Sequence, residues 1–211
     1  IIMSVKFDTI KMMILKMAEV IEENKEYLTK LDADIGDGDH GINMSKGFKI
    51  AAEKINALTS DQIEDLIKSL SMALISNVGG SSGPLYGTFF MKAAAVAKAK
   101  DEIDINDFGE MDEKGIEGVK MRGKSTQGEK TMLDVLVPAV DSLTHSLSEN
   151  IDTKTTLEIM LEKAKEGLEY TKTIAATKGR ASYLGDRSIG HIDPGAMSSY
   201  LLLETMANCL K

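Results

Sequence analysis

The chain has 211 residues and a formal net charge of −8 at neutral pH, which argues against nucleic acid or an anionic membrane as its general partner. Hydrophobic residues make up 43% of the chain, with 13 methionines, three prolines and no tryptophan, so we expect a largely aliphatic core. A single cysteine, Cys209, excludes an intrachain disulfide framework and suits a reducing cytoplasm, and no apolar run is long enough to span a bilayer.

Apolar residues recur at steps of three and four along most of the chain, which predicts an all-α fold in one domain over residues 1–211. Ile1 and Ile2 precede Met3, so we expect the natural start at Met3. Pro84 and Pro194 suit the first turn of two helices. The predicted helices, in chain order, span residues 5–27, 40–58, 61–77, 84–100, 108–121, 131–148, 155–174 and 194–211.

Eight helices joined by short connections predict an antiparallel up-and-down bundle or barrel. The connections before the second, fourth, sixth and eighth helices are rich in glycine and in charged or hydroxyl residues. They read DADIGDGDHG, NVGGSSGP, RGKSTQGEKT and KGRASYLGDRSIGHIDPG. Because alternate helices begin at the same end of such a bundle, these four loops are expected to meet at one rim.

The first of these loops suggests a site for a divalent cation. Asp32, Asp37 and Asp39 lie on a glycine-containing stretch, and hard cations prefer oxygen ligands. A calcium-binding EF-hand is excluded by its register, since Gly36 falls at a ligand position and Asn43 stands where a glutamate is required. A solvated acidic turn is the alternative interpretation.

The other loops carry groups that suit phosphate. The segment from Gly79 to Pro84 offers backbone N–H groups and two hydroxyls ahead of a helix N-terminus. Arg180 and Arg187 can hold phosphate oxygens in forked contacts, although a surface position is the alternative, above all for Arg187. Lys124 and Lys130 flank the third loop with the same ambiguity.

Together these parts are typical of phosphoryl transfer. His40 follows the acidic loop and is expected to touch metal-bound phosphate or a partner's substrate. His145 is expected to have a packing or surface role, and His191 to fix its loop. The chain has no P-loop signature and no zinc-ligand set, so nucleotide binding would require an all-helical site.

The segments DADIGDGDHGINM, GGSSGPLYGTFF, GEKTMLDVLVPA and GRASYLGDRSIGHIDPGAMSSYLLL resemble the L subunit of bacterial dihydroxyacetone kinase, the type fed by the phosphoenolpyruvate-dependent phosphotransferase system. The resemblance covers nearly the whole chain and implies an eight-helix antiparallel barrel with the nucleotide at one end. It implies tightly held ADP, with Mg²⁺ coordinated by Asp32, Asp37 and Asp39. The nucleotide contacts that it implies are His40, Gly41, Asn43, Ser81, Ser82, Gly123, Met132, Arg180, Asp193 and Gly195.

The implied reaction is a relay between partners. A phosphohistidine on a phosphotransferase subunit donates to bound ADP, and the γ-phosphoryl of the resulting ATP passes to dihydroxyacetone held on a separate K subunit. Arg180 is expected to stabilise the transferring charge, with His40 as the second catalytic candidate, and no general base is expected from this chain. A transcription regulator is a further partner to consider.

Two other interpretations stay open at this point. One is the nucleotide domain of an ATP-dependent dihydroxyacetone kinase or fatty-acid kinase, which would exchange its nucleotide rapidly with bulk ATP. The other is a non-catalytic sensor of nucleotide or divalent cation, which would bind the ligand without phosphoryl turnover.

Overall fold

The computed structural model describes residues 4–211, so the expectation about the first residues of the chain lies outside the described part. Within this range the chain forms nine α-helices, two 3-10 segments and two short strands. In chain order the elements are β1 (Ser4–Lys6), α1 (Phe7–Glu23), α2 (Lys25–Ile35), α3 (His40–Asn56), α4 (Ile63–Asn77), α5 (Ser82–Val96), β2 (Glu102–Asp104), α6 (Ile105–Gly123), α7 (Leu133–Ser148), α8 (Thr153–Tyr170), η1 (Thr171–Thr173), η2 (Arg180–Ser188) and α9 (Pro194–Leu210).

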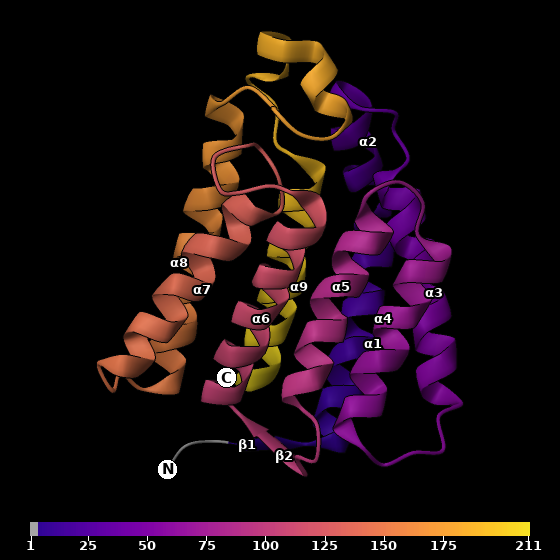
Figure 1. Cartoon of the computed structure of the whole chain (residues 1–211), viewed down its shortest axis with the longest axis vertical. Coiled ribbons are helices and arrows are strands. Elements are labelled where there is room, and N and C mark those ends of the chain that lie inside the picture. Colours follow the sequence, from indigo (N-terminus) through magenta and orange to yellow (C-terminus); the bar gives the residue numbers. More distant parts are fainter. Residues whose placement is uncertain (1–3) are drawn as a thin grey trace.

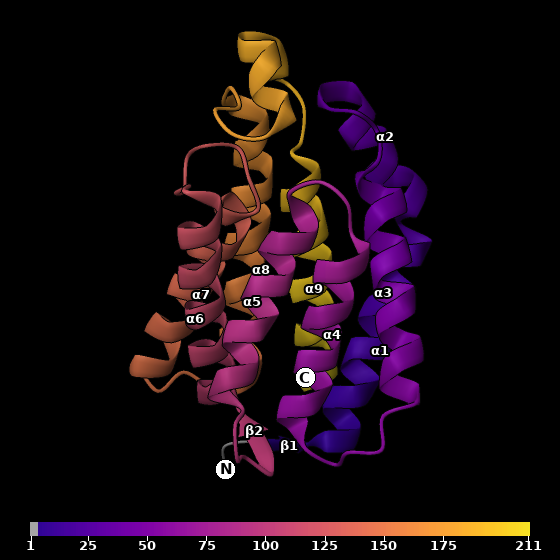
Figure 2. The same ribbon diagram turned by 45° about the vertical axis from the view of Figure 1, so that its right-hand side comes forward.

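Eight of these helices form a closed ring. Starting from α1, each helix packs on the next in the order α3, α4, α5, α6, α7, α8 and α9, and α9 packs on α1 (Figures 1 and 2). The predicted antiparallel eight-helix barrel is therefore confirmed. The starts of the seven helices predicted after residue 27 agree with the structure to within three residues.

The first predicted helix, over residues 5–27, is wrong in its extent. Helix α1 ends at Glu23, Asn24 leaves helical geometry, and α2 continues to Ile35. The Asn24 side chain donates a hydrogen bond to Val20 O at 2.8 Å, an alternative that asparagine offers the backbone at helix ends. As a result, Asp32 lies in the last turn of α2, where the sequence analysis had expected a loop.

The two strands form a small antiparallel sheet that the all-α prediction did not include. They pair Val5 with Ile103 at the end of the barrel opposite the four unusual loops (Figure 1). Ile103 is fully buried, and β-branched residues fit such a half-buried ribbon. Asp104 and Asp107 then form a capping box, with Asp107 N donating to Asp104 Oδ1 at 2.9 Å, so α6 begins at Ile105.

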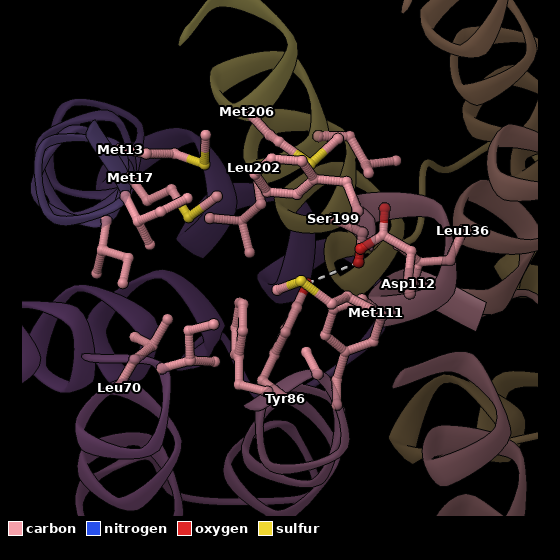
Figure 3. Close-up of a pocket in the computed structure, with 18 residues that line it drawn as sticks. Met13, Met17, Leu70, Tyr86, Met111, Asp112, Leu136, Ser199, Leu202 and Met206 are labelled. Atoms are coloured by element: carbon pink, nitrogen blue, oxygen red, sulfur yellow. Dashed lines mark hydrogen bonds between the residues drawn. The ribbon is translucent and has the colours of Figure 1, made fainter. Parts of the chain in front are cut away.

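The barrel interior is aliphatic and methionine-rich, as the composition predicts, and it contains a cavity of about 80 Å³ (Figure 3). The hydroxyls of Tyr86 and Ser199 meet at this cavity, joined by a hydrogen bond of 2.8 Å. Asp112 also lines it, and its Oδ2 has no hydrogen-bond partner among the residues that the structure describes. None of the helices between residues 4 and 211 combines the length and the hydropathy needed to cross a membrane.

Candidate functional site

The four unusual loops meet at one end of the barrel, as predicted. Helices α3, α5, α7 and α9 all begin at this end, which is the upper end in Figure 1. Here the end of α2, the end of α6 and the four loops surround a cavity of about 490 Å³. The predicted site residues that line this cavity are Asp32, Asp37, Asp39, His40, Asn43, Ser81, Ser82, Gly123, Met132, Arg180, Asp193 and Gly195.

Gly41 is the predicted residue that does not line the cavity. It lies in the first turn of α3 against α2, where an added Cβ would sit 2.0 Å from Lys25 O and 2.4 Å from Thr29 Oγ1. Only glycine permits this approach of two helices. Gly41 therefore has a packing role in this structure, and the nucleotide contact expected from it stays a prediction.

The three predicted metal ligands converge. Asp32, Asp37 and Asp39 each place one carboxylate oxygen within 4.8 Å of the others. Asp32 Oδ2 accepts hydrogen bonds from Asp39 N at 2.8 Å and His40 N at 3.0 Å, which fastens the end of α2 to the start of α3. Three carboxylates at this separation repel one another, and an all-oxygen donor set fits a hard divalent cation such as Mg²⁺.

Arg180 lies directly above this cluster, in the segment between α8 and α9. Its Nε contacts Asp37 Oδ2 at 2.9 Å, and 64% of its side chain is exposed. The guanidinium supplies positive charge to the acidic cluster, and Arg180 also lines the cavity. Arg187, from the same segment, is not among the residues that line the cavity, in line with the surface alternative.

His40 is held from both sides in a buried network. Its Nδ1 lies 3.1 Å from Ser82 Oγ, and its Nε2 lies 2.9 Å from Ser198 Oγ. Ser198 Oγ in turn lies 2.6 Å from the Tyr86 hydroxyl. Burial lowers the pKa of His40 to about 4, so its imidazole is neutral at neutral pH. With both nitrogens engaged, His40 is better suited to orienting Ser82 than to moving a proton, which differs from the catalytic expectation.

Tyr86 and Ser198 were missed by the sequence analysis. They complete this network from α5 and α9, more than a hundred residues apart in the chain. Burial raises the pKa of the Tyr86 hydroxyl, so it stays protonated and acts as a hydrogen-bond group. The available signal was the pair Ser198–Ser199 within the otherwise apolar stretch of α9, since buried hydroxyls need partners.

Two helix N-termini lie at the cavity. Helix α5 begins at Ser82, behind Gly79 to Ser81, and α9 begins at Pro194. Asp193 caps α9 by accepting a hydrogen bond from Ala196 N at 2.8 Å. Burial raises the pKa of Asp193 to about 7. Unpaired amides and the helix dipole at such termini favour phosphate oxygens.

The two remaining histidines lie where the sequence analysis expected them. His191 Nδ1 lies 3.8 Å from Asp34 Oδ2, across the gap between the last loop and α2. This contact joins the last loop to α2 outside the cavity lining and fits the expected role in fixing the loop. His145 is exposed near the end of α7, outside the cavity.

A barrel of eight helices, with clustered carboxylates and helix N-termini around one cavity, defines a helical domain suited to a metal-bound phosphate ligand. Residues 34–208 match the family model described as "DAK2 domain". The chain belongs to this family.

The chain is similar along most of its length to proteins of the same size. It is 43% identical over 196 residues to the ADP-binding subunit DhaL of the PEP-dependent dihydroxyacetone kinase of Escherichia coli, covering 93% of each chain. It is 46% identical over 190 residues to the corresponding subunit of kinase 1 of Listeria innocua, covering 89% of each chain.

Solved structures share the fold. The dihydroxyacetone kinase of C. freundii, in complex with AMP-PNP and Mg²⁺, superposes with a TM-score of 0.72 at 21% sequence identity. The match covers 99% of this chain and 35% of that one, so the barrel corresponds to about a third of the larger kinase.

Proposed function

We propose that the chain is the ADP-binding subunit of a phosphoenolpyruvate-dependent dihydroxyacetone kinase, and thus a phosphotransferase subunit that works in the cytoplasm. One observation carries the proposal: the three aspartates, the Ser81–Ser82 loop and Arg180 face a single cavity. Similarity to ADP-binding subunits over 93% of both chains supports it.

In the proposed site the carboxylates of Asp32, Asp37 and Asp39 hold Mg²⁺. The bound cation would neutralise charge on the phosphate oxygens of the nucleotide. Asp32 is the most rigid of the three, because its Oδ2 already accepts two backbone N–H groups. The nucleotide contacts proposed from this chain are His40, Asn43, Ser81, Ser82, Gly123, Met132, Arg180, Asp193 and Gly195.

The amides and hydroxyls at the start of α5 are proposed to bind the diphosphate. Ser82 Oγ faces the cavity from the first residue of the helix, and His40 Nδ1 lies 3.1 Å behind it. A neutral imidazole that already contacts Ser198 can hold the Ser82 hydroxyl in one orientation. His40 thereby contributes preorganisation, which lowers the reorganisation needed when phosphate binds.

Arg180 is proposed to stabilise the transferring phosphoryl group. Its guanidinium is held at the mouth of the site through Asp37 and stays largely exposed, so it can reach a phosphate that arrives from a partner. Planar, bidentate donors suit phosphate oxygens. No general base is proposed from this chain. Transfer to the phosphate of ADP depends mainly on positioning and charge, and the hydroxyl that accepts the γ-phosphoryl group is held on the K subunit.

Two protein partners follow from the proposed relay. A phosphohistidine-carrying subunit would phosphorylate the bound ADP, and a K subunit that holds dihydroxyacetone would accept the γ-phosphoryl group. Both must approach the end of the barrel where the cavity opens. A transcription regulator is a third proposed partner at this end.

Native mass spectrometry of the purified chain tests the proposal. We expect retained ADP with Mg²⁺, and conversion of this ADP to ATP when the phosphorylated partner subunit is added. Rapid exchange of the bound nucleotide with bulk ATP would instead indicate an ATP-dependent kinase domain. Retained nucleotide without any turnover would indicate a sensor, and the absence of Mg²⁺-dependent nucleotide binding would overturn the proposal altogether.

A further inference from the structure

Lys130 is a buried lysine whose ammonium group has no role in the function proposed above. Lys130 is 1% exposed although it belongs to the loop between α6 and α7. Its backbone has a φ of +61°, a conformation that residues other than glycine rarely adopt. A lysine held in this way is usually paired, because an isolated buried charge is strongly unfavourable.

The partners of Lys130 are two backbone carbonyl oxygens. Its Nζ donates hydrogen bonds to Thr171 O and to His191 O. Thr171 is the C-cap of α8, and His191 lies two residues ahead of the Asp193 cap of α9. One ammonium therefore joins the two ends of the segment 172–190, which carries Arg180.

Other contacts close the base of this segment at the same level. Gly190 N donates to Lys172 O at 2.7 Å, and Asp193 N donates to Thr171 Oγ1 at 3.2 Å. The segment is thus a compact loop with its ends together, an arrangement typical of functional surface loops. We name residues 172–190 the arginine loop.

The loop that carries Lys130 is itself anchored to the barrel. Asp134, fully buried in the first turn of α7, accepts hydrogen bonds from Gly128 N at 2.5 Å and Thr131 N at 2.8 Å. The carboxylates of Asp134 and Asp193 oppose the lowering of the Lys130 pKa by burial. Lys130 Nζ therefore connects the anchored loop before α7 to the base of the arginine loop.

We infer that Lys130 is a positioning residue for phosphoryl transfer: it clamps the base of the arginine loop and so fixes Arg180 over the cavity. The inference rests on the proposed function for its effect on transfer. Its structural part, the clamping of residues 172–190, stands on the Thr171 and His191 contacts alone.

Hydrogen exchange followed by mass spectrometry tests the structural part without any substrate. In Lys130→Met we expect faster amide exchange confined to residues 172–190 and the start of α9, because the two carbonyls lose their shared donor. Lys165→Met, on the exposed face of α8, is the matched control and should leave exchange unchanged. Unchanged exchange of the arginine loop in Lys130→Met would overturn the inference.

Transfer kinetics with the partner subunits test the functional part. We expect kcat of Lys130→Met to fall about tenfold or more while the affinity for Mg–ADP changes less than about threefold, since Arg180 is displaced and the metal cluster is not. The double variant Lys130→Met/Arg180→Ala should lose no more than Arg180→Ala alone, because both changes act through one group. If the kcat losses of the two single variants multiply in the double variant, Lys130 does not act through Arg180. The same conclusion follows if Lys130→Met loses affinity for ADP while its kcat is unchanged.

Lys130→Arg supplies a second test that survives misfolding of the methionine variant. It keeps the charge and the donors, so we expect a folded protein in which kcat and the amide exchange of the arginine loop lie between those of the wild type and Arg180→Ala. If Lys130→Met folds and both its kcat and the amide exchange of its arginine loop equal those of the wild type, Lys130 does not clamp the loop. If the wild type shows no transfer at all, the proposed function fails, and the exchange experiment still decides whether Lys130 clamps the loop.

Discussion

The carboxylate of Asp37 has two competing partners, an arginine and a metal ion. In the structure it pairs with Arg180 at 2.9 Å, and in the proposed function it ligates Mg²⁺ together with Asp32 and Asp39. An ion pair this exposed contributes at most about 1 kcal/mol, so a divalent cation can displace it. Arrival of the metal would then leave the guanidinium available to phosphate.

At this residue we predict that Asp37→Asn lowers the affinity for ADP at least about tenfold in the presence of Mg²⁺, because one of three anionic ligands is lost. Without Mg²⁺ the loss should be small. Isothermal titration calorimetry at several Mg²⁺ concentrations measures both. Asp101→Asn, exposed just before β2 at the opposite end of the barrel, is the control, and an equal loss in that variant would count against a metal site.

Arg180→Ala should slow phosphoryl transfer about a hundredfold or more, since a donor to the transferring group is removed. The affinity for ADP should fall much less, because the aspartates and the α5 N-terminus remain. Single-turnover transfer and calorimetry separate the two effects. Arg187→Ala, on the same segment but outside the cavity lining, should behave as wild type; equal losses of transfer and affinity in Arg180→Ala would exclude the catalytic role.

At the scale of elements, the sequence predicts the rim correctly although one helix is misassigned. The break at Asn24 splits the first predicted helix into α1 and α2, yet α3 still begins at the same end as α5, α7 and α9. The prediction depends on how often the chain reverses direction between helices. The break at Asn24 adds a helix but no reversal, because α1 and α2 together run from the lower to the upper end of the barrel (Figure 1).

What the sequence does not reveal are contacts between loops that are distant in the chain. From the sequence, Lys130 could bind phosphate or lie at the surface, whereas in the structure it contacts the carbonyl oxygens of Thr171 and His191. Arg180 was expected to face phosphate, and its contact with Asp37 depends on the path of residues 172–190. The loop sequences indicate that these residues suit phosphate, whereas the contacts that they make with other loops depend on how the barrel folds.

Gly41 connects packing to the metal cluster, because α2 carries Asp32. We predict that Gly41→Ala destabilises the protein by about 1–3 kcal/mol through overpacking against Lys25 O and Thr29. It should also weaken Mg²⁺-dependent ADP binding, as α2 is pushed away from α3. Chemical unfolding and calorimetry measure the two effects.

The control for this change is Gly109→Ala in α6. An added Cβ there would meet Thr144 Cγ2 at 3.6 Å, an ordinary contact, and alanine favours helices more than glycine does. This variant should be as stable as wild type or slightly more so. A stable Gly41→Ala protein with normal ADP affinity would show that the close approach of α2 is not required.

For the whole molecule, the buried Asp112 makes stability depend on pH. Burial raises the pKa of Asp112 from 3.8 to about 7, so between about pH 4 and pH 7 the folded state binds a proton that the unfolded state has lost. Stability therefore falls as the pH rises through this window and levels off above it. The full effect above pH 7 is at most about 4 kcal/mol.

We predict that Asp112→Asn removes this dependence. The variant should match the wild type near pH 4 and exceed its free energy of unfolding at pH 8, because no charge is left inside the barrel. Urea unfolding at several pH values gives the difference curve, in which the titration of Asp193 cancels. Asp141→Asn, exposed on α7, is the control, and a constant difference between Asp112→Asn and wild type across pH 4–8 would show that Asp112 does not titrate in this range.

The contact between α1 and α9 closes the ring, and α9 also brings Asp193 and Gly195 to the cavity. During translation, the barrel therefore stays open until α9 has been synthesised and can pack on α1. Contacts between such remote segments form late and slowly. A ribosome-bound chain that lacks α9 should neither retain nucleotide nor resist protease, and both properties should appear together once that helix emerges from the exit tunnel.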